Sequence, residues 1–165
     1  MKRLTCLVLV LALALSATVC TRSTADAKPT PIPGGANQKQ AVSGTLGQML
    51  FNGKVRLEID VVREETPEEA ADLHPFAGQK VVHIEGILRN AMHETVTIRP
   101  EYTLADKDDV TQKVGVLDVP VVTLEQGAAG KQKIRTLVPK DFVPVKLIVT
   151  PGQLFGPAFR ITLTK

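Results

Sequence analysis

The sequence predicts an all-β protein, an antiparallel β-sandwich of seven to eight strands with one short helix. Three observations carry this prediction. Short segments of alternating apolar and polar residues recur along the chain, as in strands with one face on a core and one in water. Turn signals separate these segments, because the chain contains 12 Gly and 11 Pro. After the N-terminal apolar segment, only the stretch near residues 66–74 has the features of a helix.

The first 27 residues have the features of a secretion signal. Lys2 and Arg3 precede an apolar run over 7–19, which forms about 20 Å of helix and is shorter than a bilayer core of about 30 Å. Ala25-Asp26-Ala27 supplies a small-x-small cleavage site, so we expect residues 1–27 to be removed. The alternative is lipoprotein processing at Cys20, although the branched Val19 occupies a position where a small residue is preferred. We therefore predict export to the periplasm or the extracellular space, with a lipoprotein anchored at Cys20 as the alternative.

Removal of the signal leaves a mature chain of 138 residues, which is enough for one domain with a single core. It takes away three basic residues and one acidic residue, so 17 basic and 16 acidic side chains remain and the net charge is +1. A nearly neutral chain with interspersed charges lacks the basic surface that nucleic acids require. Both cysteines lie in the signal, which excludes disulfides, thiol catalysis and cysteine-ligated metals in the mature protein.

Composition divides the mature chain into two parts. Residues 28–48 are rich in Pro, Gly and small polar residues and have little to bury, so we expect a flexible lead-in that keeps the cleavage site accessible. Residues 49–165 form the expected sandwich domain.

The first strand of the domain is expected at 54–61. Every second residue from Val55 to Val61 is apolar and the residues between them are charged, which predicts one buried and one solvated face. A helix would place apolar residues three and four positions apart, and the β-branched content also favours a strand.

The single helix is expected to begin after Thr66. Thr66 is suited to cap the helix, Pro67 suits its first position, and Glu69 is placed to reach back to the cap amide. Pro75 ends the helical stretch. The acidic residues around this start are better explained by the helix N-terminus than by a calcium loop.

Seven further segments have the features of strands. They lie at 81–89, 95–106, 110–116, 119–124, 131–138, 145–150 and 158–164. Pro100 within the second of these indicates an edge strand or a bulge. Alternation places Val82, Ile84 and Leu88 toward the core. The residues expected to face outward include Val81, His83, Glu85, Ile87, Arg89 and Ile148.

Four short motifs follow one another within residues 50–150. They are Gly86-Ile87-Leu88-Arg89-Asn90, Tyr102-Thr103-Leu104-Ala105-Asp106-Lys107-Asp108, Leu124-Glu125-Gln126-Gly127 and Val138-Pro139. In this order they resemble the telokin-like, immunoglobulin-fold domain family of bacterial secreted proteins and lipoproteins, most of them of unknown function. Asp109 stands where this family usually has Gly, and Gln126 where it usually has Pro. The resemblance implies an Ig-like β-sandwich and no particular activity.

Enzymatic chemistry finds little support in the residues. The mature chain has one serine, Ser43, and it lies in the expected lead-in, which excludes a serine-based triad. The acidic residues near Asp108 lack the Gly and the closing Glu of a calcium loop, so a hairpin turn is expected. Five Phe, one Tyr and no Trp offer few aromatic surfaces for a sugar site.

Two functions from different classes follow. The first is an exported, non-enzymatic Ig-like module that binds a protein or a cell-envelope component, with no catalytic residues, no cofactor, and contact with the membrane only if Cys20 is lipidated. The alternative is a periplasmic copper- or zinc-handling protein that uses His83, Met92 and His93, because imidazole and thioether groups together suit copper.

Overall fold

The structure is a computed structural model that describes residues 32–115 and 119–163. The expected signal at 1–27 with Cys20, the start of the lead-in, and the ends of the strands expected at 110–116 and 158–164 lie outside the described residues. Within the described part of the chain, no helix is long and apolar enough to cross a membrane.

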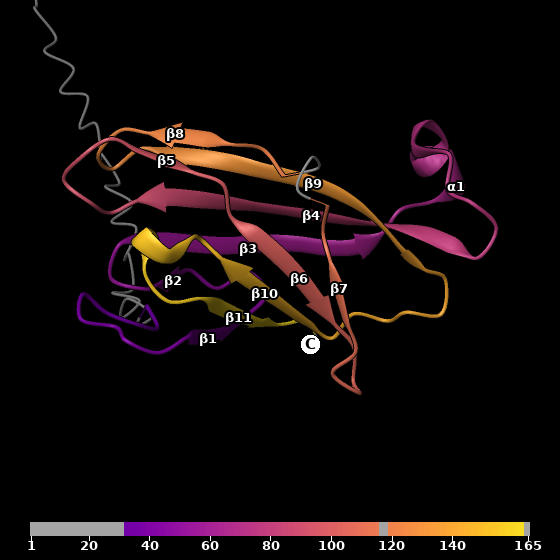
Figure 1. Cartoon of the computed structure of the whole chain (residues 1–165), viewed down its shortest axis with the longest axis horizontal. Coiled ribbons are helices and arrows are strands. Elements are labelled where there is room, and N and C mark those ends of the chain that lie inside the picture. The colour runs from indigo at the N-terminus through magenta and orange to yellow at the C-terminus, as the bar shows by residue number, and fades with distance from the viewer. Residues whose placement is uncertain (1–31, 116–118, 164–165) are drawn as a thin grey trace, which may run out of the picture. The chain divides into compact units, whose positions relative to one another are not determined.

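Two large sheets and one small sheet form an Ig-like β-sandwich (Figure 1). The five-stranded sheet has the order β1-β11-β10-β6-β7. Its strands are β1 Val42–Thr45, β11 Phe159–Thr162, β10 Lys146–Thr150, β6 Glu101–Ala105 and β7 Thr111–Lys113. The four-stranded sheet has the order β2-β3-β4-β9, with β2 Leu50–Phe51, β3 Val55–Glu64, β4 Gln79–Asn90 and β9 Ala129–Pro139. The small sheet pairs β5 Val96–Ile98 with β8 Val122–Leu124.

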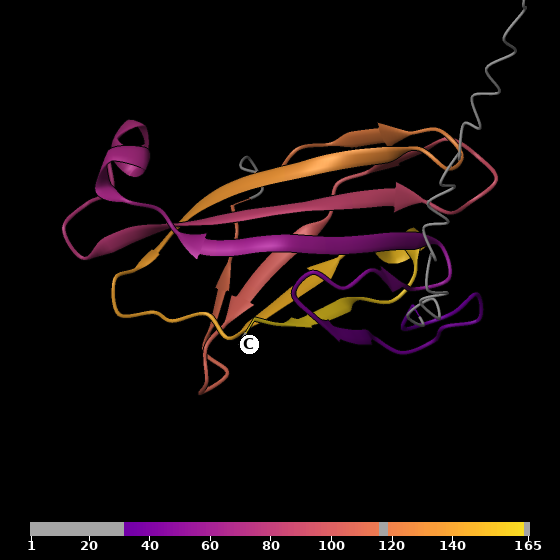
Figure 2. The same cartoon turned by 180° about the vertical axis from the view of Figure 1, so that it is seen from behind.

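One apolar core lies between the two large sheets. It contains Leu57, Ile84 and Ile134 from the four-stranded sheet together with Leu147 and Phe159 from the five-stranded sheet, all with at most 1% of their surface exposed. Figure 2 shows the two layers from behind, with the strands of one running obliquely across those of the other. The predicted all-β sandwich with one short helix is therefore confirmed.

The described residues contain eleven strands, more than the seven to eight expected, and Pro100 explains one of the differences. The strand expected at 95–106 divides there into β5 and β6, which belong to different sheets. Proline has no N–H to donate to a ladder, so the chain leaves one sheet at this residue and enters the other.

β1 and β2, which lie before the first expected strand, are the other two additional strands. β1 pairs in parallel with β11, and Val42 is buried in the core, whereas the remaining strand pairs are antiparallel. The flexible lead-in expected over 28–48 is therefore wrong for its last residues, because a single buried Val and a neighbouring strand edge are enough to order this short segment. Farther upstream, the carbonyl of Pro33 accepts a hydrogen bond from the N–H of Phe51, so part of the lead-in covers the edge of β2.

The helix begins as the sequence predicts. Thr66 accepts a hydrogen bond from the backbone N–H of Glu69, and the Glu69 carboxylate accepts one from the N–H of Thr66, which is the expected capping box. α1 Pro67–Ala70 continues as a 3-10 turn, η1 Ala71–Leu73. A second 3-10 turn, η3 Gln153–Phe155, precedes β11.

A β-bulge in β3 changes which residues face the core. Ile59 pairs with Gly86 and Val61 pairs with Glu85, so Asp60 is the extra residue. Val61, expected on the core face, therefore lies on the outer face, and Val62 packs against the core instead. The backbones approach closely here, since a Cβ on Gly86 would lie 3.1 Å from Cα of Ile59.

The side chain of Asn52 is buried at one end of the four-stranded sheet and hydrogen-bonds to four backbone groups. Asn52 is 1% exposed; its Nδ2 donates to the carbonyls of Phe155 at 2.9 Å and Pro157 at 2.8 Å, and its Oδ1 accepts from the N–H groups of Lys54 at 3.1 Å and Val55 at 2.9 Å. This side chain therefore joins the β2–β3 turn to the segment before β11.

We expect Asn52→Ala to lower the free energy of unfolding by about 2–4 kcal/mol, because several buried backbone groups lose their partners. Urea denaturation measures this loss. Gln153→Ala, which truncates an exposed side chain in the nearby η3 turn, is the control and should change stability by less than about 0.5 kcal/mol. An equally small loss for Asn52→Ala would show that the joint is not a stabilising element.

Candidate functional site

The histidine proposed as a metal ligand is bonded within the protein instead. His83 is 4% exposed on the outer face of β4. Its Nδ1 lies 2.9 Å from Oε1 of Glu65, and its Nε2 lies 2.8 Å from Oε1 of Glu85. Both ring nitrogens are occupied, so neither is free for copper or zinc.

The other two members of that set lie elsewhere. Met92 and His93 follow the end of β4, and the seven residues of strand between His83 and Asn90 span about 23 Å. His93 Nδ1 lies 3.2 Å from Nε2 of Gln126, a residue of the β8–β9 turn. The structure therefore does not bring His83, Met92 and His93 together, and residues 32–115 and 119–163 hold no cluster of three or more potential metal-binding side chains.

Arg135 on β9 is the centre of the network around His83. Its Nε lies 2.8 Å from Oε1 of Glu65 and its Nη2 lies 2.7 Å from Oε2, so the buried carboxylate is held in a fork. The same guanidinium donates to both oxygens of Asp72 in η1, at 2.7 and 2.8 Å, and to the carbonyl of Glu69. Arg135 therefore anchors α1 and η1 to the outer face of the four-stranded sheet.

Val81 shows the effect of this anchoring. It was expected to face outward, but it is only 1% exposed and lies outside the core between the sheets, at the end of β4 nearest α1. Ala70 of α1 is likewise buried outside that core. Both apolar side chains are therefore buried outside the core between the two large sheets.

The pKa values in the network follow from its hydrogen bonds. Arg135 holds the pKa of the Glu65 and Asp72 carboxyls below their ordinary values. A fork from Arg63 lowers the pKa of Glu69 to about 2, and the bond to His83 lowers the pKa of Glu85. Carboxylates stabilised in their charged form are suited to anchoring and poorly suited to general acid catalysis.

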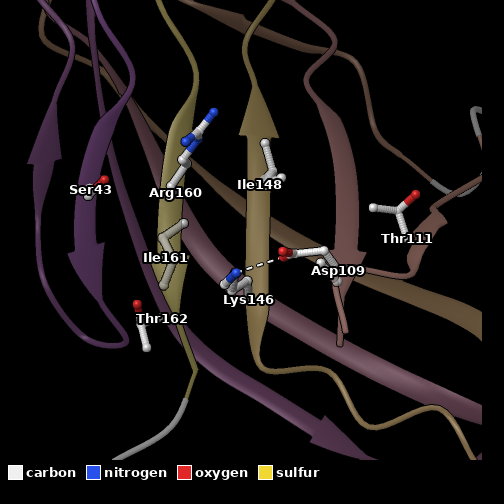
Figure 3. A pocket seen from close by; sticks show the side chains of 9 residues that line it. Ser43, Asp109, Thr111, Lys146, Ile148, Arg160, Ile161 and Thr162 are labelled. Carbon is white, nitrogen blue, oxygen red and sulfur yellow. Dashed lines mark hydrogen bonds and ion pairs between the residues drawn. The ribbon is translucent and has the colours of Figure 1, made fainter. Parts of the chain in front are cut away.

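A hollow of about 470 Å³ lies on the other side of the molecule, over the outer face of the five-stranded sheet (Figure 3). We call this feature the sheet hollow. Its lining comes from β1, β6, β7, β10 and β11 and from the β6–β7 turn. The lining residues are Ser43, Ala105, Asp109, Thr111, Lys146, Ile148, Arg160, Ile161 and Thr162.

Cross-strand register explains why these side chains meet. Ser43, Arg160 and Ile148 occupy one row across β1, β11 and β10, and Thr162 and Lys146 pair in the next row. Because side chains alternate between the faces of a strand, both rows point away from the core. The sheet hollow is thus built on paired strands rather than on loops.

The charges of the sheet hollow are partly compensated. Lys146 Nζ lies 2.7 Å from Oδ1 of Asp109, which lowers the pKa of that carboxyl. Arg160 has no ion pair with any other described residue, and Figure 3 shows its guanidinium directed away from the Lys146–Asp109 pair. Ser43, the only serine of residues 28–165, has Arg160 rather than an imidazole as its cross-strand neighbour. The lining therefore offers hydroxyl and cationic donors beside the half-buried Ile148.

Sequence reasoning missed this hollow. Ile148 was expected to face outward, and it does, but no contiguous surface could be assigned to it. The missing information was the pairing of β1 with β11, which brings Ser43 beside Arg160 across more than 100 residues of sequence.

The turn between β6 and β7, which contains the end of the second motif, is a hairpin turn. Oδ1 of Asp106 accepts hydrogen bonds from the N–H groups of Asp108 and Val110, both at 2.9 Å, and Asp109 has a positive φ of 58°. Asp109 therefore takes the left-handed conformation that a Gly adopts without strain. The expected hairpin turn is confirmed at this position.

Comparisons with known proteins give only likenesses of fold. No protein-family model and no curated protein matches the sequence. A conserved hypothetical protein from Bacillus anthracis has a TM-score of 0.48 at 15% identity, over 64% of this chain and 87% of that one. An uncharacterised β-sandwich protein from Clostridium difficile has a TM-score of 0.40 at 9% identity, over 77% and 95%. A β-glucosidase from Erythrobacter marinus has a TM-score of 0.36 at 13% identity, over 67% of this chain and 16% of that one.

We expect Arg135→Gln to lower the free energy of unfolding by about 3 kcal/mol at pH 7, because it leaves the buried Glu65 carboxylate without its cation. The folded-state pKa of Glu65 lies below its ordinary value of 4.5. The stabilisation is therefore fully present above about pH 4.5 and is lost as the pH falls through the folded-state pKa. Urea denaturation between pH 7 and pH 2.5 should show the gap between wild type and variant closing toward acid.

Arg63→Gln is the matched control. It breaks the exposed Arg63–Glu69 pair and should cost less than about 1 kcal/mol. A gap for Arg135→Gln that stays constant with pH would contradict the assignment of the effect to Glu65.

Proposed function

We propose that this chain is an exported, non-enzymatic Ig-like module that binds a protein or a cell-envelope component through the sheet hollow. The observation that supports the proposal is the 470 Å³ hollow on the outer face of the five-stranded sheet, within the size range of ligand sites. Its floor consists of paired strands, which hold the donor groups in place before a partner arrives.

The chemistry of the lining favours binding over catalysis. Arg160, a residue type enriched at protein interfaces, lies among the hydroxyl groups of Ser43 and Thr162 and the apolar Ile148. The hydroxyl of Ser43 has a guanidinium beside it, which is not a base that activates a nucleophile. A polar partner surface with some negative charge suits this lining.

The remaining parts of the proposal rest on the sequence. The charged start, short apolar run and Ala25-Asp26-Ala27 site support export. The motif order, including Asn90 and the Asp106 turn, supports membership of the telokin-like Ig-fold family. Lipidation at Cys20 would place the module on a membrane surface and make the residues that follow Cys20 its tether.

We expect the protein recovered from the envelope fraction of its own host to have an intact mass that begins at Lys28. Native mass spectrometry measures this directly. A mass that begins at a lipidated Cys20 would establish the anchored form, and a mass that includes residues 1–27 would contradict export by a cleaved signal.

We expect the double variant Ile148→Asp/Arg160→Glu to remain folded and to lose its partner in cross-linked envelope extracts by at least tenfold. Both side chains lie on the outer face, so the change inverts the charge of the sheet hollow without entering the core. Quantitative mass spectrometry of the captured proteins gives the ratio, and circular dichroism checks the fold.

Ile87→Asp is the matched control, because Ile87 is a half-buried isoleucine on the outer face of the opposite sheet. It should retain the same partner. Equal capture by wild type, double variant and control would reject the sheet hollow as the binding surface.

A further inference from the structure

Two arginines stand directly opposite each other on the outer face of the four-stranded sheet. Arg56 on β3 pairs in register with Arg89 on β4, and both side chains are exposed. Opposed residues on one face of an antiparallel pair have Cβ atoms about 5 Å apart, so the two arginine side chains leave the sheet as direct neighbours. Phe51 on β2 completes the row, with its ring centroid 5.3 Å from Cζ of Arg56.

This pair has no acidic partner in the part of the chain that the structure describes. No ion pair joins either arginine to a carboxylate, and Glu58, the nearest acidic residue along β3, lies opposite Ile87 instead. Like charges placed directly opposite each other on a sheet are destabilising. The arrangement contrasts with the other end of this face, where Arg63 and Arg135 are both paired with carboxylates.

The two arginines also line a hollow of about 250 Å³ at the end of β4. Its remaining walls are the turn after β4, with Ala91 and Met92, and the β8–β9 turn, with Gln126 and Gly127. We call this feature the arginine hollow. A stacked aromatic ring on one side and two turns on the other limit the positions available to the guanidinium groups.

Asn90 holds those two turns together. Its buried side chain donates to the carbonyls of Glu94 at 2.6 Å and Leu124 at 3.1 Å, and accepts a hydrogen bond from the N–H of Met92 at 2.8 Å. The backbone N–H of Gly127 donates to the Asn90 carbonyl at 3.1 Å. The walls of the arginine hollow are therefore ordered by the same residue that ends the strand.

We propose that the arginine hollow binds a dianionic phosphate group. Two adjacent guanidinium groups carry a charge of +2, which matches the charge of about −2 on inorganic phosphate or a terminal phosphate monoester better than the single charge of a carboxylate. Each guanidinium presents paired N–H donors to phosphate oxygens, and the repulsion between the two cations is relieved when the anion lies between them. Gln126 adds an uncharged amide at the rim.

Phosphate titration of the ¹⁵N-labelled mature chain, followed by NMR, tests the proposal. We expect saturable shifts of the Arg56 and Arg89 side-chain Nε–H signals and of the Met92 and Gln126 amides, with a Kd on the order of millimolar for two exposed guanidinium groups. Arg56→Gln and Arg89→Gln should each weaken binding at least tenfold. Arg63→Gln, which removes an exposed arginine from the other end of the same sheet face, outside both hollows, should leave it unchanged.

Other anions distinguish the chemical class. Glycerol phosphate, a monoester, should bind as inorganic phosphate does, whereas dimethyl phosphate and acetate, each with one negative charge, should bind at least fivefold more weakly. Equal binding of acetate would replace the phosphate assignment by a carboxylate site. Shifts that do not saturate, or that persist in both Arg→Gln variants, would overturn the proposal.

Stability gives an independent readout. In phosphate-free buffer of low ionic strength, Arg89→Gln should raise the midpoint of thermal unfolding, because it removes the opposed like charges, and the gain should disappear in 0.5 M NaCl. A lower midpoint in the variant would show that Arg89 is a structural contact and would count against the proposal.

Discussion

The register of β4 between β3 and β9 determines which side chains meet on each face of the four-stranded sheet. β4 is paired on both edges over most of its length, so each of its side chains faces either the core or the outer surface of the sheet. Inward, Ile84 and Leu88 complete the core. Outward, His83 meets Glu65 and Arg135, and Arg89 meets Arg56. A shift of one residue would bury the charges and expose the core side chains, so the core fixes the position of every charged group on the outer face.

That outer face has two ends with opposite electrostatics. At the α1 end, carboxylates from the loop and helix satisfy Arg63 and Arg135, and the helix covers the surface. At the Asn90 end no helix among residues 32–115 and 119–163 covers the face, and two arginines line a hollow between turns. At the α1 end the arginines form ion pairs that attach the helix, and at the Asn90 end the arginines are available to a ligand. The two ends differ because Glu65, Glu69 and Asp72 lie near the arginines at the α1 end, whereas no carboxylate of the described residues pairs with Arg56 or Arg89 at the other end.

Much of the architecture could be predicted because local patterns determine it. Alternation predicted β3, β4, β9 and β10, and the Thr66–Glu69 spacing predicted the capping box. Three features could not be predicted, because each depends on contacts between distant segments. The bulge at Asp60 moved Val61 outward, the pairing of β1 with β11 ordered residues expected to be flexible, and Arg135 closed over His83 from 52 positions away. The predictions of candidate sites were the least accurate. The proposed metal site required His83, Met92 and His93, which are close in sequence, to lie together, whereas the extended strand between them keeps them apart.

Net charge is a poor guide to binding in this chain. The net charge of +1 over residues 28–165 predicts little attraction for anions and argues against an extended basic surface of the kind that nucleic acids need. The structure nevertheless separates the charges, because acidic residues are concentrated in the turn and helix near α1 and in the β6–β7 turn. Among the described arginines without an ion pair, Arg56 and Arg89 on one sheet and Arg160 on the other form two small cationic sites on opposite faces. Sites of that size suit single anionic groups or a local acidic patch on a partner. The two proposals therefore assign a different ligand to the outer face of each large sheet, a protein or envelope component to the five-stranded sheet and a phosphate group to the four-stranded sheet.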